Sequence, residues 1–209
     1  MIIIKTTKVN IADRKKGIIL DVTKKLIVQY GYAKTTLDDI AGALGIKKSS
    51  LYYYYKNKED IIYEVMMREK SLYLKCIKEA LEIEGSTLYK VLSYERAKEN
   101  YLKESISPFD LTVSQFIEIK KSIKDIFKNI ECDEKQILAE VISNGIKKNE
   151  LKKCSKDRVA ETIINISEAI RLKEFHNSET QRMKESDFDK VRKQIEEIIN
   201  LIFDGIKKQ

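Results

Sequence analysis

Apolar residues recur at intervals of three and four along most of the chain, which is the spacing of one face of an α-helix. In the first such segment, Ile18, Val22, Leu26 and Tyr30 follow one another at steps of four, with Ile19 and Ile27 alongside. Gly31 comes directly after this stripe and is a typical stop signal. The pattern predicts a helix over this segment, with the stripe as its apolar face.

Two short helices are predicted next. Thr36 can cap the start of the first one, and Asp39 can reach back to it in a capping box. Gly45 breaks this helix, and a third helix is predicted from about Lys47 to Tyr54. Two short helices joined by a tight glycine turn are the pattern of a helix-turn-helix, whose second helix can enter the major groove of DNA.

Longer helices are predicted over the rest of the chain. Asn57 and Asp60 repeat the capping pattern ahead of a long helix that begins near Lys58. The later helices are predicted as a stripe from Phe116 that ends near Glu131, then Asp133 to Lys148, Asp157 to about Phe175, and Asp187 to Lys207.

The predicted fold is all-α, with a three-helix helix-turn-helix head, a larger helical bundle as the body, and about nine helices in total. The composition agrees, because one proline and seven glycines among 209 residues leave few turns. We expect the head to cover residues 1–57 and the body residues 58–209.

Positive charge is concentrated in the head. The whole chain has a net charge of +7, and residues 1–58 hold 12 Lys/Arg against 4 Asp/Glu, which gives +8. A near-neutral body that carries a basic head is the electrostatic footprint of a nucleic-acid binder. A lysine-rich surface without a partner would instead spread the excess evenly.

The third helix offers suitable chemistry for DNA. Its segment reads KKSSLYYYYK over residues 47–56, with lysines for phosphates, hydroxyls for phosphates or base edges, and tyrosines with both ring and hydroxyl. Leu51, Tyr52 and Tyr55 are expected to pack inward, which leaves Tyr53 and Tyr54 as the better candidates for DNA contact.

Residues 30–41 (YGYAKTTLDDIA), 44–46 (LGI) and 50–60 (SLYYYYKNKED) together resemble the TetR family of bacterial repressors. The resemblance covers about fifty residues in unbroken register. It implies a three-helix DNA-binding head and a larger helical body that binds a small effector and dimerises through its last two long helices.

Carried over by position, the resemblance implies that Thr36 caps its helix and binds a phosphate, and that Tyr54 and Lys58 contact the DNA backbone. Family members usually have a small hydroxyl residue in place of Lys47 and often glycine in place of Ser49. The base specificity of other members therefore cannot be transferred to this chain. The expected DNA-binding residues are Thr35, Thr36, Lys47, Lys48, Ser49, Ser50, Tyr53, Tyr54 and Lys58.

The last two predicted helices are apolar on more than one face, which fits packing both on their own body and on a second subunit. The expected dimer-interface residues are Ile163, Ile166, Ile170, Ile195, Ile199 and Ile202. Any effector is expected to be small and hydrophobic or amphipathic. The residues that could line its pocket are Tyr63, Met66, Tyr94, Tyr101, Phe109 and Phe116, although each could instead be an ordinary core residue.

Other classes of function have little support. The sequence lacks a phosphate-binding glycine loop and metal-ligand spacing, its single histidine, His176, lies in a polar stretch, and its three cysteines form no CxxC pair. We therefore expect neither an enzyme nor a cofactor or metal, and the lack of a long apolar run predicts a cytoplasmic protein. The predicted function is a dimeric repressor that binds a palindromic operator in double-stranded DNA and is released by an effector. The alternatives are a body that binds a protein partner, or a non-specific architectural DNA binder.

Overall fold

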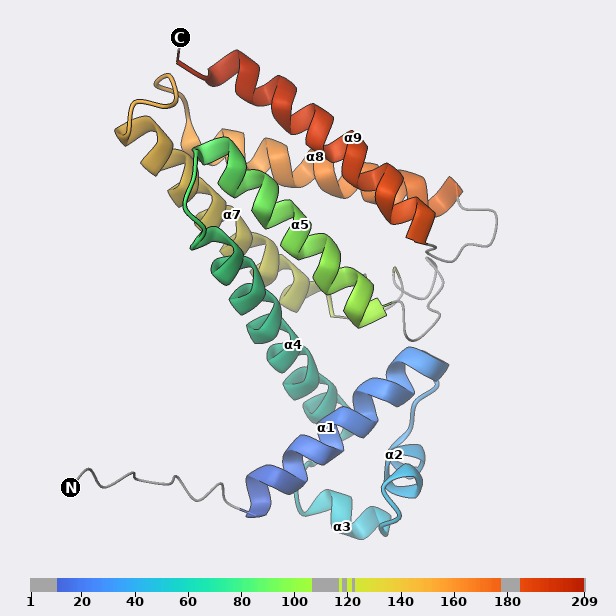
Figure 1. The fold of residues 1–209 in the computed structure, drawn as a ribbon. Coiled ribbons are helices and arrows are strands. Elements are labelled where there is room, and N and C mark those ends of the chain that lie inside the picture. The colour runs from blue at the N-terminus through green and yellow to red at the C-terminus, as the bar shows by residue number, and fades with distance from the viewer. Residues whose placement is uncertain (1–10, 107–116, 118–119, 122, 178–184, 209) are drawn as a thin grey trace, which may run out of the picture. The chain divides into compact units, whose positions relative to one another are not determined.

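The computed structural model describes residues 11–106, 117, 120–121, 123–177 and 185–208, which contain eight α-helices (Figure 1). The helices are α1 (Ile11–Tyr30), α2 (Leu37–Ala43), α3 (Lys48–Tyr52), α4 (Lys58–Leu81), α5 (Thr87–Ile106), α7 (Lys124–Lys147), α8 (Lys156–Asn177) and α9 (Glu185–Ile206). Over the described ranges the only β-type pairing is an isolated bridge between Leu151 and Lys207. The predicted all-α class is confirmed, with a helix count close to the predicted nine.

The chain divides into two compact units between Arg68 and Glu69, inside α4. The sequence places the boundary earlier, at the start of α4. The reason for the difference is that the first turns of α4 complete the small core of the first unit, where Ile61 and Val65 pack with Ile40 and Leu51.

Helix α1 buries one side of the predicted stripe. Ile19 and Ile27 are among its buried residues, whereas Ile18 and Tyr30 are each 51% exposed. An α-helix has 3.6 residues per turn, so residues spaced by four drift by about 40° per step around the axis. Three such steps separate Ile18 from Tyr30, so the two ends of the stripe turn toward solvent.

The second unit is a bundle in which α5, α7, α8 and α9 pack on one another (Figure 1). Helix α9 contributes an inward stripe of Phe188, Val191, Ile195, Ile199 and Phe203, all buried. A stripe at spacings of three and four on a 22-residue helix gives one continuous apolar face against the body. The predicted position of this helix is confirmed.

Helix α7 runs without a break where the sequence predicts one. The apolar pattern predicts the end of one helix near Glu131 and the start of another at Asp133, but α7 is continuous through both residues. The polar run at this point resembles a loop, yet Glu134 lies on the same inward face as Leu138 and is 3% exposed. Glu134, a charged residue with buried partners, occupies a core position at which the apolar pattern has no apolar residue.

The α7–α8 loop fastens the bundle at one end. Thr87, at the start of α5, donates to the Glu150 carboxylate from its backbone N–H at 2.6 Å and from its hydroxyl at 2.8 Å. The backbone N–H of Lys152 donates to the carbonyl of Ile206 in α9 at 2.8 Å. Gly145 of α7 lies so close to α5 that a Cβ atom there would fall 2.2 Å from the Thr87 hydroxyl oxygen.

None of the helices in the described residues is long and apolar enough to cross a membrane.

Candidate functional site

Helix α2 starts with the predicted capping box. The hydroxyl of Thr36 accepts a hydrogen bond from the backbone N–H of Asp39 at 3.2 Å, and the Asp39 carboxylate accepts one from the Thr36 N–H at 2.8 Å. The hydrogen bonds from Thr36 lower the pKa of Asp39 below its ordinary value. The predicted role of Thr36 as a helix cap is confirmed, and its side chain remains on the surface.

Thr35 does not lie where a DNA contact requires. Its side chain is buried, with the residue only 1% exposed, and its hydroxyl donates to the carbonyl of Gly31 at 2.9 Å. Gly31 has a φ of 88°, which closes the turn that draws Thr35 inward. Thr35 therefore supports the turn between α1 and α2, and its expected contact with DNA does not fit this placement.

Helix α3 presents most of its side chains to solvent. Lys47, Lys48, Ser49 and Ser50 are exposed, and Tyr53 directly after the helix is 83% exposed. Lys47 occupies the N-cap position, and its side chain makes no capping hydrogen bond there. The lysines and hydroxyls expected to face DNA thus share one exposed surface.

The tyrosines of this segment are not buried and exposed in the way the sequence predicts. Leu51 and Tyr55 are buried as expected, at 1% and 6% exposure, but Tyr52 is 50% exposed. Leu51 and Tyr55 are four residues apart and take the inward positions, which turns the residue after Leu51 by about 100° away from the core. Tyr54 is half-buried, and its ring meets that of Tyr53 edge-to-face with centroids 5.1 Å apart.

Two of the expected DNA-contacting lysines have partners within the first unit. The Lys48 ammonium donates to a carboxylate oxygen of Asp38 at 2.7 Å, across the helix-turn-helix. The Lys58 ammonium donates to the carbonyl of Tyr32 at 3.2 Å and lies 5.0 Å from the centre of the Tyr32 ring. Both contacts connect segments that are distant in sequence, and the predictions did not include them.

The residues expected to line an effector pocket are distributed over both units and the part of the chain that the structure does not describe. Tyr63 and Met66 belong to the first unit, where Tyr63 is 58% exposed beside a surface hollow of about 600 Å³. Tyr94 and Tyr101 belong to the second unit, where Tyr94 is fully buried. Phe109 and Phe116 lie outside the described residues.

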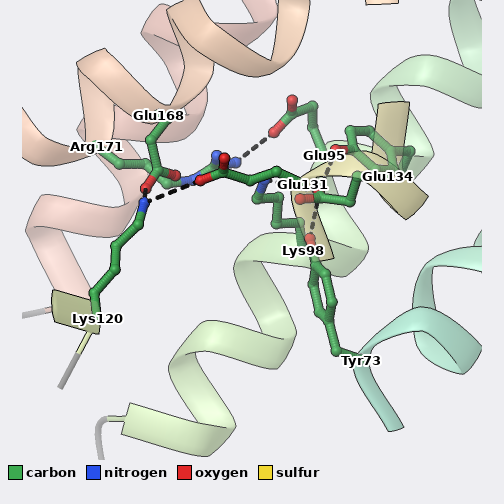
Figure 2. Close-up of polar contacts among 9 residues, drawn as sticks. Tyr73, Glu95, Lys98, Lys120, Glu131, Glu134, Glu168 and Arg171 are labelled. Carbon is green, nitrogen blue, oxygen red and sulfur yellow. Dashed lines mark hydrogen bonds and ion pairs between the residues drawn. The ribbon is translucent and has the colours of Figure 1, made fainter. Parts of the chain in front are cut away.

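The second unit contains a polar cluster, which we call the body cluster: Tyr73, Tyr94, Glu95, Lys98, Glu134, Glu168 and Arg171. All of these residues except the half-buried Glu168 are buried, and Figure 2 shows the charged members with Tyr73. At its centre, one carboxylate oxygen of Glu134 accepts hydrogen bonds from the hydroxyls of Tyr73 and Tyr94 and from the Lys98 ammonium. Lys98 approaches to 2.8 Å and is itself 6% exposed. Three donors therefore converge on one buried carboxylate oxygen.

The charges of the body cluster alter the pKa values of its members. Burial alone would raise the pKa of Glu134, but the Lys98 ammonium and the three hydrogen bonds outweigh it, so this pKa is lowered. Burial and the neighbouring Glu134 carboxylate raise the pKa values of Tyr73 and Tyr94 well above their ordinary value. The cluster thus holds Glu134 ionised and both tyrosines neutral.

A second ion pair in the body cluster joins α5 to α8. The Arg171 guanidinium donates to one carboxylate oxygen of Glu95, and both residues are 4% exposed (Figure 2). The other carboxylate oxygen of Glu95 and one terminal nitrogen of Arg171 are buried without a hydrogen-bond partner among the described residues. Nearby, Lys120 pairs with Glu168 at 2.9 Å.

The sequence did not predict the body cluster as a group. Five of its seven members are charged residues on helices, and such residues ordinarily face solvent. The available signal was position, because Glu134 falls four residues before Leu138 and eight before Ile142, in line with a buried apolar stripe. A charged residue in that register requires buried partners, whose identity the sequence does not reveal.

Most of the expected dimer-interface residues pack within their own subunit. Ile163, Ile170, Ile195 and Ile199 are between 1% and 9% exposed and belong to the core of the second unit. Ile166 and Ile202 are half-buried. The exposed apolar residue on the other side of α9 is Leu201, at 65%. The apolar stripe of α9 is satisfied by its own body, so a partner helix would have to meet the face that carries Leu201.

The remaining candidates have ordinary surroundings. Cys132 is exposed, Cys76 and Cys154 are half-buried, and all three are free thiols. His176 is exposed in the last turn of α8, as predicted. Over the described part of the chain, His, Cys, Asp and Glu side chains form no group of three or more that could hold a metal ion.

A capped helix α2, a glycine turn and an exposed helix α3 on a small shared core define a helix-turn-helix DNA-binding unit. In this turn Gly45 has a φ of 66°. A profile described as bacterial regulatory proteins of the tetR family matches residues 19–65, which covers this unit. The helix-turn-helix unit, residues 19–65, is thus similar to the TetR family of bacterial regulatory proteins.

Individual relatives agree with this assignment. The biofilm operon icaADBC negative transcriptional regulator IcaR of Staphylococcus epidermidis is 52% identical over 46 residues, which are 22% of this chain and 25% of that protein. A transcriptional regulator from Cytophaga hutchinsonii has the same fold, with a TM-score of 0.75, 24% identity, and coverage of 94% of this chain and 100% of that chain. A structure from Saccharomonospora viridis in complex with choline has a TM-score of 0.67 at 17% identity, covering 94% of this chain and 99% of that chain.

Proposed function

We propose that this protein is a transcriptional repressor that binds a palindromic DNA operator as a dimer and is released by a small-molecule effector. The observation that carries the proposal is the exposed surface of α3, where lysine, serine and tyrosine side chains stand together on a helix-turn-helix. The excess charge of the head supports it, because phosphate binding supplies much of the affinity for DNA.

In this proposal α3 enters the major groove, and its side chains make different contacts with the DNA. Lys47 contributes charge near the phosphates, since two lysines at a helix N-terminus oppose the helix dipole unless an anion lies beside them. Ser49 and Ser50 reach phosphates or base edges. Tyr53, the most exposed large side chain of this surface, contributes apolar contact and a hydroxyl group.

The first prediction concerns Tyr53. We expect the protein to bind the DNA upstream of its own gene about a thousandfold more tightly than a scrambled duplex. The variant Tyr53→Ala should reduce this ratio by about tenfold or more, since a lost base contact costs about 1–3 kcal/mol. Fluorescence anisotropy at near-physiological salt measures both affinities.

Tyr30→Ala is the matched control, because Tyr30 is a half-exposed tyrosine at the end of α1 in the same unit. This variant should bind like the wild type. Equal binding of the wild type to both duplexes would instead favour a non-specific architectural protein, and equal losses in the two variants would contradict the proposed role of α3.

The effector, in this proposal, meets the Glu95–Arg171 pair of the body cluster. Among the described residues, one acceptor and one donor of the pair have no partner, both buried, and a buried polar atom without a partner is costly. A hydroxyl or amide group of a ligand can accept from Arg171 and donate to Glu95 at the same time. The choline-containing structure with this fold supports a ligand-binding body, although it says nothing of the ligand of this chain.

An anionic group suits this position less well than a neutral one. The cations of this group, Lys98, Lys120 and Arg171, already pair with carboxylates of Glu134, of Glu168 and Glu131, and of Glu95. An added buried anion would have no free counter-ion, and burying an unpaired charge is unfavourable. The proposed effector is therefore a small amphipathic molecule whose buried polar group is not an anion.

A further inference from the structure

Asp38 places a negative charge on the surface that the proposed function assigns to DNA. It lies in the first turn of α2, and its side chain is 68% exposed. Its carboxylate accepts a hydrogen bond from the ammonium of Lys48, the first residue of α3, at 2.7 Å. This ion pair joins the two helices of the helix-turn-helix across their exposed side.

The neighbouring acid has a structural task that Asp38 does not share. Asp39 completes the capping box with Thr36 and stabilises the start of α2. Asp38 instead points across the turn to Lys48, and exposed ion pairs of this kind contribute little to stability. Asp38 also lies in the first turn of α2, where the helix dipole favours an acid by only a modest amount. The fold can therefore lose Asp38 at small cost, and its ion pair with Lys48 on this surface requires an explanation of its own.

Electrostatics gives that explanation. Affinity for unrelated DNA comes almost entirely from lysines and arginines that replace the counterions of phosphates. While Lys48 is paired with Asp38, its charge is neutralised locally and is less available to any phosphate that approaches. An ammonium has three N–H donors, so Asp38 can hold one of them and leave the other two for acceptors on a base edge.

We propose that Asp38 is a specificity-determining residue that acts through Lys48. It weakens binding to every DNA sequence through charge, and it aligns Lys48 for contact with the operator, so that non-operator DNA loses more affinity than the operator does. This inference rests on the proposed function, because it requires a protein that discriminates between DNA sequences.

The test is a double-mutant cycle with Asp38→Asn, Lys48→Gln and the variant that carries both. Anisotropy is measured on the operator fragment and on a scrambled duplex over a range of salt concentrations. Asp38→Asn should raise affinity for the scrambled duplex about fivefold per head and steepen its salt dependence by about one counterion per head. Operator affinity should rise by less than about twofold, so discrimination falls.

Two further measurements separate this role from simpler ones. In the Lys48→Gln background, Asp38→Asn should have little effect on either duplex, because the partner is gone. Asp13→Asn, which removes the same charge from an exposed position in α1, should change scrambled-duplex binding less than Asp38→Asn does. The melting temperature of Asp38→Asn should stay within about 2 °C of the wild type.

The inference is overturned if Asp38→Asn raises affinity for both duplexes equally, or if the rise persists without Lys48. A wild-type protein that binds both duplexes equally would overturn the proposed function, and this inference with it. If the wild type discriminates between the two duplexes and the Asp38→Asn variant binds both of them as the wild type does, the inference about Asp38 is overturned and the proposed function is not.

Discussion

Glu134→Leu should lower the free energy of unfolding of the protein by about 3–5 kcal/mol. The substitution removes the carboxylate that accepts from Tyr73, Tyr94 and Lys98. The Lys98 ammonium then remains buried without its counter-ion, and two buried tyrosine hydroxyls lose their acceptor. Urea denaturation followed by circular dichroism measures the loss.

Glu131→Gln is the matched control, since Glu131 lies on the same helix one turn earlier and its side chain is 53% exposed. It should cost less than about 1 kcal/mol. The double variant Lys98→Met/Glu134→Leu should recover most of the stability, because neither charge is then left unpaired. A double variant as unstable as Glu134→Leu alone would show that packing, and not charge, causes the loss.

Glu134 also makes the stability of the protein depend on pH. Because the folded state lowers the pKa of Glu134 below its ordinary value of 4.5, folding favours the ionised carboxylate. Its contribution is complete above that ordinary value and is lost as the pH falls through the lower folded pKa. Glu134→Leu should therefore lose less stability than the wild type between neutral and acidic pH.

Leu201→Glu should convert the proposed dimer into a monomer at micromolar concentration. The apolar stripe of α9 packs inside its own subunit, and Leu201 on the opposite side is 65% exposed. A carboxylate at the centre of an apolar interface would be desolvated without a partner, which costs at least about 2 kcal/mol per copy. Multi-angle light scattering gives the mass directly, and operator affinity should fall with it.

Leu72→Glu provides the comparison, because Leu72 is a half-exposed leucine on α4, away from α9 in sequence. This variant should remain a dimer and keep its affinity for the operator. If the wild type and Leu201→Glu are both dimers, the dimer interface does not include this face of α9. A monomeric wild type would instead contradict the proposal that the protein is a dimer.

The helix-turn-helix could be predicted from sequence because its signals are local. Thr36 and Asp39 are three residues apart, and the capping box that they predict forms as expected. Glycine positions marked both turns correctly, at Gly31 and Gly45. The error at Tyr52 came from a helix of only five residues, which is too short for an apolar pattern to fix which side faces inward.

The body was less predictable because its polar contacts join distant residues. Tyr73 and Glu134 are 61 positions apart, and Glu95 and Arg171 are 76 apart. No local pattern reports that a glutamate on one helix meets an arginine on another. The dimer interface stays a prediction for a related reason, since an apolar residue shows that a helix face is buried but not whether its own subunit or a partner covers it.

Gly145 limits how the bundle can change shape. With a hydroxyl oxygen 2.2 Å from where its Cβ would be, the Thr87 side chain at the start of α5 packs directly on the backbone of α7, and Glu150 binds the same threonine from the loop. Sliding of α5 along α7 would force this contact apart, so the contact acts as a pivot. Any movement that a ligand causes in α5 must therefore grow with distance from Thr87, and it is largest toward the helix's far end.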